Sequence, residues 1–129
     1  MSKFTEAAYT NKKEILKFPD HYVAVAVTID DAGVTADASG KKIVPAGTIL
    51  GGGVLADPSK LAKKATTTTG VDPAPDTTNA EGVLLNDVDV TYGPASGAML
   101  IHGFVDLNKI PTAPTALEKD ALKQITFIA

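Results

Sequence analysis

Two aspartates separated by one residue are the first side chains in this sequence that could do chemistry. Asp87 and Asp89 lie in the segment NDVDV, and residues two apart on a β-strand point to the same face. Such a pair could bind a calcium ion or act as an acid and a base. Hard cations take six or more oxygen ligands, and no further oxygen-rich cluster accompanies the pair. A solvated strand face or turn is therefore the favoured interpretation.

A single histidine, His102 in the segment MLIHGFV, is the second candidate. The chain has no cysteine, and its other histidine is His21, so the sequence gives no recognisable zinc site. A general base needs an activated nucleophile, and Ser59 and Ser96 do not lie in the sharp strand-to-helix turn that would activate one. We interpret His102 as a hydrogen-bonded structural residue beside a close backbone contact at Gly103.

Three consecutive glycines, Gly51 to Gly53, raise the possibility of a phosphate-binding loop. The segment GTILGGGVLAD lacks both the P-loop pattern and the dinucleotide-binding pattern of glycines, and no lysine, serine or threonine stands where a P-loop needs it. We predict instead that the triplet lets a strand end bend sharply or lets another backbone approach closely. We therefore expect no catalytic residue, no metal site and no cofactor.

The apolar patterning around these residues predicts β-strands. YVAVAVTI (22–29) is rich in valine, and a Pro45-Ala46-Gly47 turn leads into a short strand TIL (48–50). EGVLLNDVDVTYG (81–93) and GAMLIHGFVDL (97–107) predict two core strands that pair or lie close together. ITFIA (125–129) is expected to end the chain as a strand.

Two capping boxes predict short helices. Asn11 and Glu14 have the spacing for a helix of one or two turns that ends at Pro19. Thr115 and Glu118 precede a helix that places Leu117, Ala121, Leu122 and Ile125 on one side. The first helix is far shorter than the roughly 12 residues needed for stability in isolation. Residues 1–20 are therefore expected to form an arm that becomes ordered against something else.

A polar stretch interrupts the strands. Residues from about 57 to 79 are rich in Lys, Thr, Pro and Asp and have almost no large apolar side chain after Leu61. A loop of this length is uncommon in a compact domain and usually signals mobility or function. We predict a long surface loop here, and favour a solvated loop over a binding loop.

Composition excludes several classes of protein. The net charge is −3 and all 12 cationic residues are lysines, which disfavours a nucleic-acid partner. No apolar run is long enough to cross a membrane, and the N-terminus has no signal-peptide core, so we expect a soluble protein made in the cytoplasm. The chain has 129 residues and few aromatic side chains, which predicts one small domain whose thin core benefits from association with a partner.

Several blocks in fixed order carry a resemblance to a known family. VPAGTILGGG (44–53), then AEGVLLNDVDVT (80–91), then GAMLIHGFVDLNKI (97–110), together with the tail ALKQITFI (121–128), are similar to segments of tailed-phage head decoration proteins of the lambda type and of the related head fibre proteins. These blocks cover about half of the chain. The polar stretch at 57–79 and the N-terminal arm with its own helix signals depart from the family pattern.

The resemblance implies a capsid-stabilising protein. Such a protein would sit as a homotrimer on the outer surface of the assembled phage head, bridging subunits of the major capsid protein, and would be found in the virion. Residues 1–20 would be the capsid-docking arm, and residues 21–129 the β decoration domain. The apolar anchors of the arm would be Phe4, Tyr9, Ile15, Leu16 and Phe18.

We therefore expect a mainly β protein, a small β-clip or β-tulip-like domain with one or two short helices and an extended N-terminal arm. It would decorate a capsid without acting as an enzyme, and without a small-molecule substrate, nucleic acid or membrane as partner. The alternative is an adhesion or carbohydrate-binding module on the virion surface, with the polar stretch facing the receptor. Glycan binding usually relies on exposed aromatic side chains, and only Tyr9 and Tyr92 suggest themselves.

Overall fold

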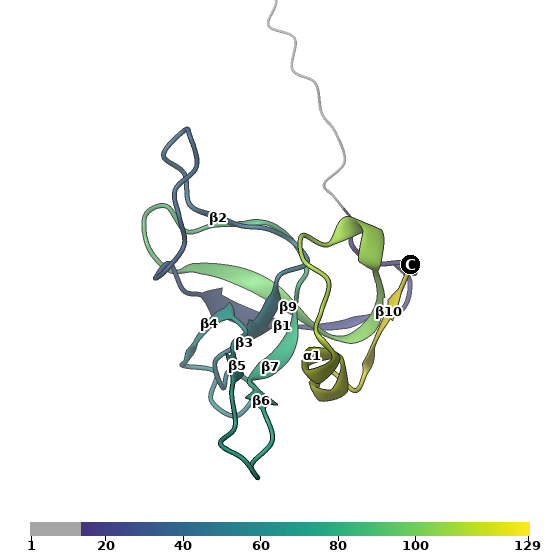
Figure 1. The fold of residues 1–129 in the computed structure, drawn as a ribbon. Helices are drawn as coiled ribbons and strands as arrows, with labels where there is room; N and C mark the ends of the chain where they lie inside the picture. The colour runs from purple at the N-terminus through teal and green to yellow at the C-terminus, as the bar shows by residue number, and fades with distance from the viewer. Residues whose placement is uncertain (1–13) are drawn as a thin grey trace, which may run out of the picture.

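The fold is mainly β, as the sequence predicts (Figure 1). A computed structural model describes residues 14–129 of the chain. The predicted anchors Phe4 and Tyr9 and the predicted helix cap Asn11 lie outside these residues. The strands are β1 (Val23–Ile29), β2 (Ile43–Val44), β3 (Ile49–Gly51), β4 (Leu61–Lys64), β5 (Thr67–Thr68), β6 (Thr77–Thr78), β7 (Ala80–Leu84), β8 (Val88–Asp89), β9 (Ala95–Asp106) and β10 (Ile125–Ile128); the helices are the 3-10 turn η1 (Leu107–Lys109) and α1 (Ala116–Ala121).

Six strands form one mixed sheet in the order β1-β4-β3-β7-β9-β10. Strand β1 pairs with β9 as well as with β4. The five strands β1, β4, β3, β7 and β9 therefore close into a ring, and β10 pairs with β9 outside it. The β1–β4 and β9–β10 pairs are parallel, and the other pairs of the sheet are antiparallel. Two further pairs, β2 with β8 and β5 with β6, lie outside this sheet.

Strand β9, 12 residues long, is the central element of the sheet. Its residues 95–102 pair with β1, while residues 103–106 pair with β10. It also pairs with β7 at Leu100 and Met99, which confirms the prediction that the segments 81–93 and 97–107 contain neighbouring core strands. The predicted strands at 22–29, 48–50 and 125–129 are likewise confirmed as β1, β3 and β10, with bounds shifted by a residue or so.

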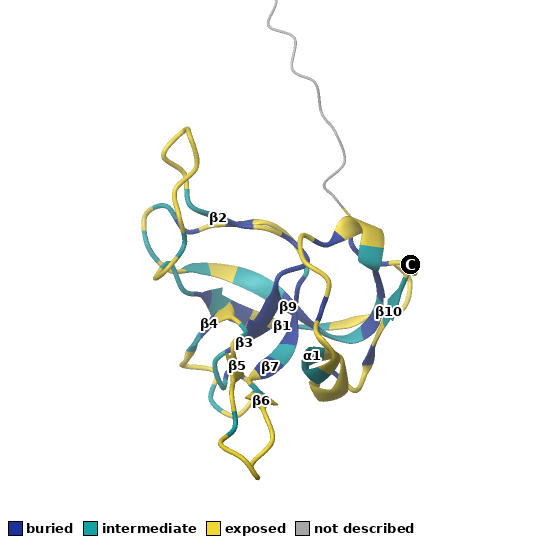
Figure 2. Ribbon diagram, in the orientation of Figure 1, coloured by how far each residue is buried: buried dark blue, intermediate teal, exposed yellow. Residues whose placement is uncertain are grey.

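Both faces of the central strands are buried, which explains their nearly continuous apolar sequence. Much of β7 and part of β9 are coloured as buried in Figure 2. Neighbouring residues of one strand belong to different core clusters: Val83 and Leu84 of β7 do so, and so do Met99 and Leu100 of β9. Successive side chains of a strand point to opposite faces, so one cluster lies on each face. The first cluster contains Ile15, Leu16, Ala46, Ile49, Ala80, Val83, Leu100, Val105, Ile110, Leu122 and Ile125. The second contains Val27, Ile29, Val44, Leu50, Val54, Ala62, Leu84, Val88, Val90 and Met99.

The stretch from 57 to 79 is not the structureless loop that its composition predicts. Ala62 is fully buried, and β4 pairs with both β1 and β3. The following threonines form the small β5–β6 hairpin, whose side chains are largely exposed. Threonine is β-branched and favours strands, so a polar threonine run can pair with itself at the surface without contributing to the core.

Only one of the two predicted capping boxes forms within the described residues. Thr115 and Glu118 cap α1 reciprocally, as predicted. The helix predicted before Pro19 is absent from residues 14–18, where Leu16 instead bridges to Val105 of β9. Glu14 still accepts a hydrogen bond, from the backbone N–H of Leu16 at 3.0 Å. A one-turn helix has little stability of its own, so pairing with β9 is preferred.

Candidate docking surface

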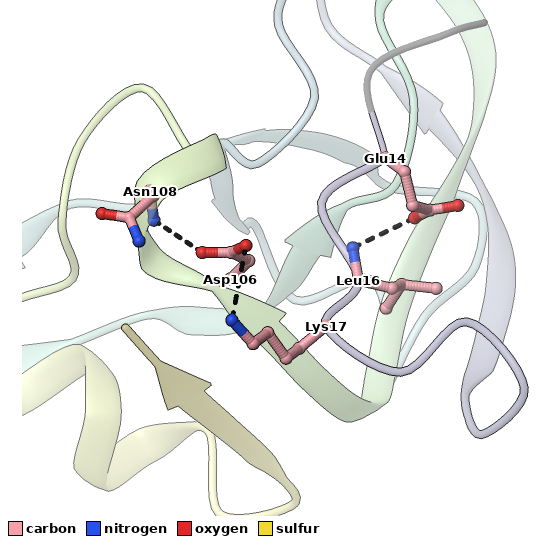
Figure 3. Close-up of polar contacts among 5 residues, drawn as sticks. All are labelled: Glu14, Leu16, Lys17, Asp106 and Asn108. Atoms are coloured by element: carbon pink, nitrogen blue, oxygen red, sulfur yellow. Dashed lines mark hydrogen bonds and ion pairs between the residues drawn. The ribbon is translucent and has the colours of Figure 1, made fainter.

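The segment before β1 is attached to the C-terminal half of β9 by backbone hydrogen bonds and by an ion pair of Lys17 with Asp106, and Figure 3 shows this ion pair. The N–H of Lys17 donates to the carbonyl of Phe104, and the N–H of Asp106 donates to the carbonyl of Ile15, both at 2.8 Å. The Lys17 ammonium lies 3.9 Å from a carboxylate oxygen of Asp106. The other carboxylate oxygen accepts from the N–H of Asn108 at the start of η1. The segment is therefore bound to β9 both by backbone hydrogen bonds and by the ion pair of the Lys17 side chain with Asp106.

The structure buries two of the predicted docking residues inside the domain. Ile15 is fully buried and Leu16 is 5% exposed, and both pack in the first core cluster. These side chains do not present a surface to a partner in this conformation, so the expected arm of residues 1–20 includes part of the core of the domain. The physical reason is that Val105 and Leu100 leave an apolar face of β9 that must be covered. Of the predicted anchors within the described residues, Phe18 is the one that stays on the surface, 51% exposed.

Phe18 belongs to a group of side chains at the surface that we call the aromatic patch: Phe18, His21, His102 and Phe104, whose rings contact one another, together with Tyr22 and Val23, which follow His21 in the sequence. His102 and Phe104 are half-buried, and the other four are exposed. The ring of Phe18 meets that of Phe104 edge-on, with centroids 5.3 Å apart. Tyr22 and Val23 are each about half exposed. Aromatic side chains that keep half of their area exposed are the residues that most often anchor protein–protein contacts. The patch can therefore bind an apolar surface of a partner.

The two histidines of the chain meet within this patch. The Nε2 atoms of His21 and His102 are 3.0 Å apart, and the rings lie nearly perpendicular with centroids 5.0 Å apart. The prediction that His102 is hydrogen-bonded is confirmed. The backbone contact at Gly103 is looser than predicted, since a Cβ there would lie 3.4 Å from the carbonyl oxygen of His21 and 3.3 Å from the Cβ of Tyr22. The Nδ1 atom of His102 is buried and has no hydrogen-bond partner among residues 14–129.

The remaining sequence candidates hold loops in place. Asp87 accepts a 2.7 Å hydrogen bond from the N–H of Ala46, which fixes the Pro45-Ala46-Gly47 turn to the β7–β8 connection. Asp89 accepts from both the N–H and the hydroxyl of Thr91. These hydrogen bonds, the side-chain one first, hold the pKa of Asp89 below its ordinary value of 3.8. The two carboxylates therefore serve separate turns, in keeping with the interpretation as a solvated strand face or turn.

The glycine triplet makes close backbone contacts, as predicted. A Cβ on Gly51 would lie 2.4 Å from the carbonyl oxygen of Asn79, and one on Gly52 would lie 2.6 Å from that of Leu61. The N–H groups that follow point at the carboxylate of Glu81, which accepts from residues 53, 54 and 55. Consecutive N–H groups of this kind form an anion-binding nest. Here the anion is a side chain of the protein itself, so the loop does not offer this position to a phosphate.

A pocket of about 290 Å³ lies between β3, the β1–β2 connection and the segment after η1. Its walls include Val34, Ile43, Val44 and Pro111, and charged groups contributed by Lys63, Glu118 and others. Among residues 14–129, no three or more His, Asp or Glu side chains gather closely enough to hold a metal ion, and no helix is long and apolar enough to span a membrane.

Comparison with protein-family models, with curated proteins and with solved structures finds no significant match to this chain.

Sequence reasoning missed most of the aromatic patch. His21 comes close to His102 and Phe104 because β1 and β9 are antiparallel with Val23 opposite His102. Residues 21 and 102 are 81 positions apart, and no local spacing links them. A pairing of the apolar segments 22–29 and 97–107 would have indicated the contact, because it brings the residues just before β1 alongside the middle of β9.

Proposed function

We propose that this chain is a bacteriophage capsid decoration protein. It binds the outer surface of the assembled head as a homotrimer, contacts the major capsid protein, and stabilises the shell without catalysing a reaction. In this proposal the mainly β domain is of the β-clip or β-tulip-like class, and its location is the virion. The ordered sequence blocks that resemble head decoration proteins support this proposal.

One observation carries the proposal: the aromatic patch lies where the N-terminal segment joins the domain. Ile15 and Leu16 fix the segment to β9, and Phe18, Tyr22 and Val23 then expose apolar area immediately after it. Residues before Glu14, including Phe4 and Tyr9, would contact the capsid alongside the patch. The docking surface is thus a patch on the domain extended by the start of the chain.

Binding only to the assembled shell makes such a contact stabilising. A ligand that binds only one state stabilises that state by RT ln(1 + [L]/Kd). This is about 2.7 kcal/mol per site when the free ligand concentration is a hundred times Kd. The aromatic patch consists of six residues, fewer than the roughly 20–30 on each side of a standard interface. Three copies joined in a trimer would engage together, so that the loss of one contact is reversed before the others are lost.

The direct test is cosedimentation of the purified protein with undecorated heads of its phage. The variant Phe18→Ala is expected to weaken binding by about tenfold or more, because exposed aromatic anchors dominate interface energies. Tyr92→Ala is the matched control, since Tyr92 is a fully exposed aromatic residue on the β8–β9 connection. Failure of the unmodified protein to cosediment, or equal binding by the two variants, would contradict the proposal.

A second function, adhesion through a glycan or another receptor, is favoured by the surface position of the β5–β6 hairpin and by Tyr92. A glycan array separates the two functions. Specific binding that is lost in Tyr92→Ala and kept in Phe18→Ala would support adhesion, whereas an array without hits would dispose of it.

A further inference from the structure

The contact between His21 and His102 supports a site that the sequence does not suggest. The two imidazoles come from separate parts of the chain, and their Nε2 atoms approach to 3.0 Å at the surface of the aromatic patch. We propose that His21 and His102 together bind one divalent transition-metal ion, such as Ni²⁺, Cu²⁺ or Zn²⁺, through their Nε2 atoms. This inference is independent of the capsid-binding proposal.

The spacing of the nitrogens fits two ligands of one ion. Imidazole nitrogens bind these metals at about 2.0–2.1 Å, so two of them in neighbouring coordination positions lie about 3 Å apart. The rings are inclined at 68° with centroids 5.0 Å apart, so modest rotations direct both nitrogen lone pairs at a shared point. The backbone needs no rearrangement, because the β1–β9 pairing with Val23 opposite His102 already holds both residues.

The protonation states are also compatible with metal binding. In the metal-free pair one Nε2 carries a hydrogen and donates it to the other. Binding a metal through both Nε2 atoms requires that hydrogen to move to Nδ1 of the same ring by exchange with solvent, so that both rings stay neutral. The buried Nδ1 of His102 has no hydrogen-bond partner among residues 14–129, so no hydrogen bond there favours either tautomer of this ring. At His102, the change of tautomer therefore breaks no hydrogen bond at Nδ1.

The chemistry of the site limits which ions it takes. Imidazole suits zinc, copper and nickel, whereas magnesium and calcium require oxygen ligands. Two protein ligands leave several coordination positions for water, because no third His, Asp or Glu side chain of residues 14–129 joins the pair. The ion would link the turn at residues 18–22 to β9 and so fix the arrangement of the aromatic patch.

The test is a calorimetric titration of the full-length, tag-free protein with NiCl₂ and with ZnCl₂ near pH 7.5, together with amide NMR spectra. We expect one ion per chain, signal changes centred on residues 21 and 102, and no competition from Mg²⁺ or Ca²⁺. His21→Gln and His102→Gln are each expected to weaken binding by about tenfold or more, since even outer-shell partners of a metal site contribute that much. Asp120→Asn, an exposed carboxylate on α1, is the control and should bind like the unmodified protein.

The proposal is wrong if no heat and no signal changes appear, or if both histidine variants bind as the unmodified protein does. His21 is exposed, so His21→Gln should keep the fold even if His102→Gln does not. Unchanged binding in a folded His21→Gln variant is therefore sufficient to overturn the site.

Discussion

Gly47 is the residue on which the turn before β3 depends. Its φ of +89° is unfavourable for any residue with a side chain, and an added Cβ would lie 2.6 Å from Ile110. Gly40 has a similar φ of +78° with nothing near its Cβ position. Both Gly→Ala variants incur the left-handed backbone cost of about 1–2 kcal/mol, while Gly47→Ala also overpacks the core.

The free energy of unfolding from urea denaturation is expected to fall more in Gly47→Ala than in Gly40→Ala, by about 1–3 kcal/mol. Equal losses in the two variants would mean that Ile110 moves away freely and that the turn is not packed as described.

The hydrogen bonds that Asp89 accepts from Thr91 should make the stability of the fold depend on pH. The pKa of Asp89 is lower in the folded protein than its ordinary value of 3.8, so the folded state favours the charged form. Such a group stabilises the fold fully above the unfolded-state pKa, and this contribution is lost as the pH falls through the folded-state pKa. The difference in urea midpoint between the unmodified protein and Asp89→Asn should therefore shrink from about pH 5 to about pH 2. A constant difference over this range would exclude the role assigned to the carboxylate.

At the scale of elements, the segment before β1 is part of the fold. A chain that starts at Glu14 keeps Ile15 and Leu16, whereas one that starts at Pro19 removes both from the first core cluster. Each buried Leu or Ile contributes about 2–5 kcal/mol, so the chain starting at Pro19 should be less stable by more than about 4 kcal/mol. The measurement is the free energy of unfolding of the two truncated proteins.

The single variant Leu16→Ala tests the same point without truncation, with an expected loss of about 2–5 kcal/mol. If both truncated chains unfolded at the same urea concentration, the packing of this segment on β9 would be refuted. A capsid-binding test by truncation must therefore begin at Glu14, because deletion to residue 18 confounds binding with folding.

The elements could be predicted where the sequence pattern is local. The Thr115–Glu118 box, the valine-rich β1 and the Pro-Ala-Gly turn all carry their signals within a few residues. The prediction of a helix before Pro19 failed because Leu16 pairs with Val105 instead, and Val105 lies about ninety residues away in the sequence. The β4 strand was missed for a similar reason, since its lysine-rich sequence acquires a burial site at Ala62 only through β1 and β3.

Most of the candidate site depends on pairings that no local pattern reveals. Phe18 could be singled out as an apolar residue in a polar segment, but its ring partner Phe104 and the His21–His102 contact follow from the register of β9 with its neighbours. Ile15 and Leu16 carry the same apolar signal as Phe18. Only the packed structure distinguishes side chains that complete the core from those that remain available to a partner.

At the scale of the whole molecule, the proposed function is to stabilise the assembled shell by binding to it. Each bound copy would tie neighbouring capsid subunits together, using the aromatic patch and the residues before Glu14. The central claim is therefore about the stability of the particle that carries the protein.

The most direct measurement is the temperature at which DNA is released from heads lacking the protein, recorded with and without a saturating amount of the purified chain. The account predicts that the added protein raises this temperature, and that Phe18→Ala at the same concentration raises it less. An unchanged release temperature, with the protein shown to be folded and in excess, would contradict the account.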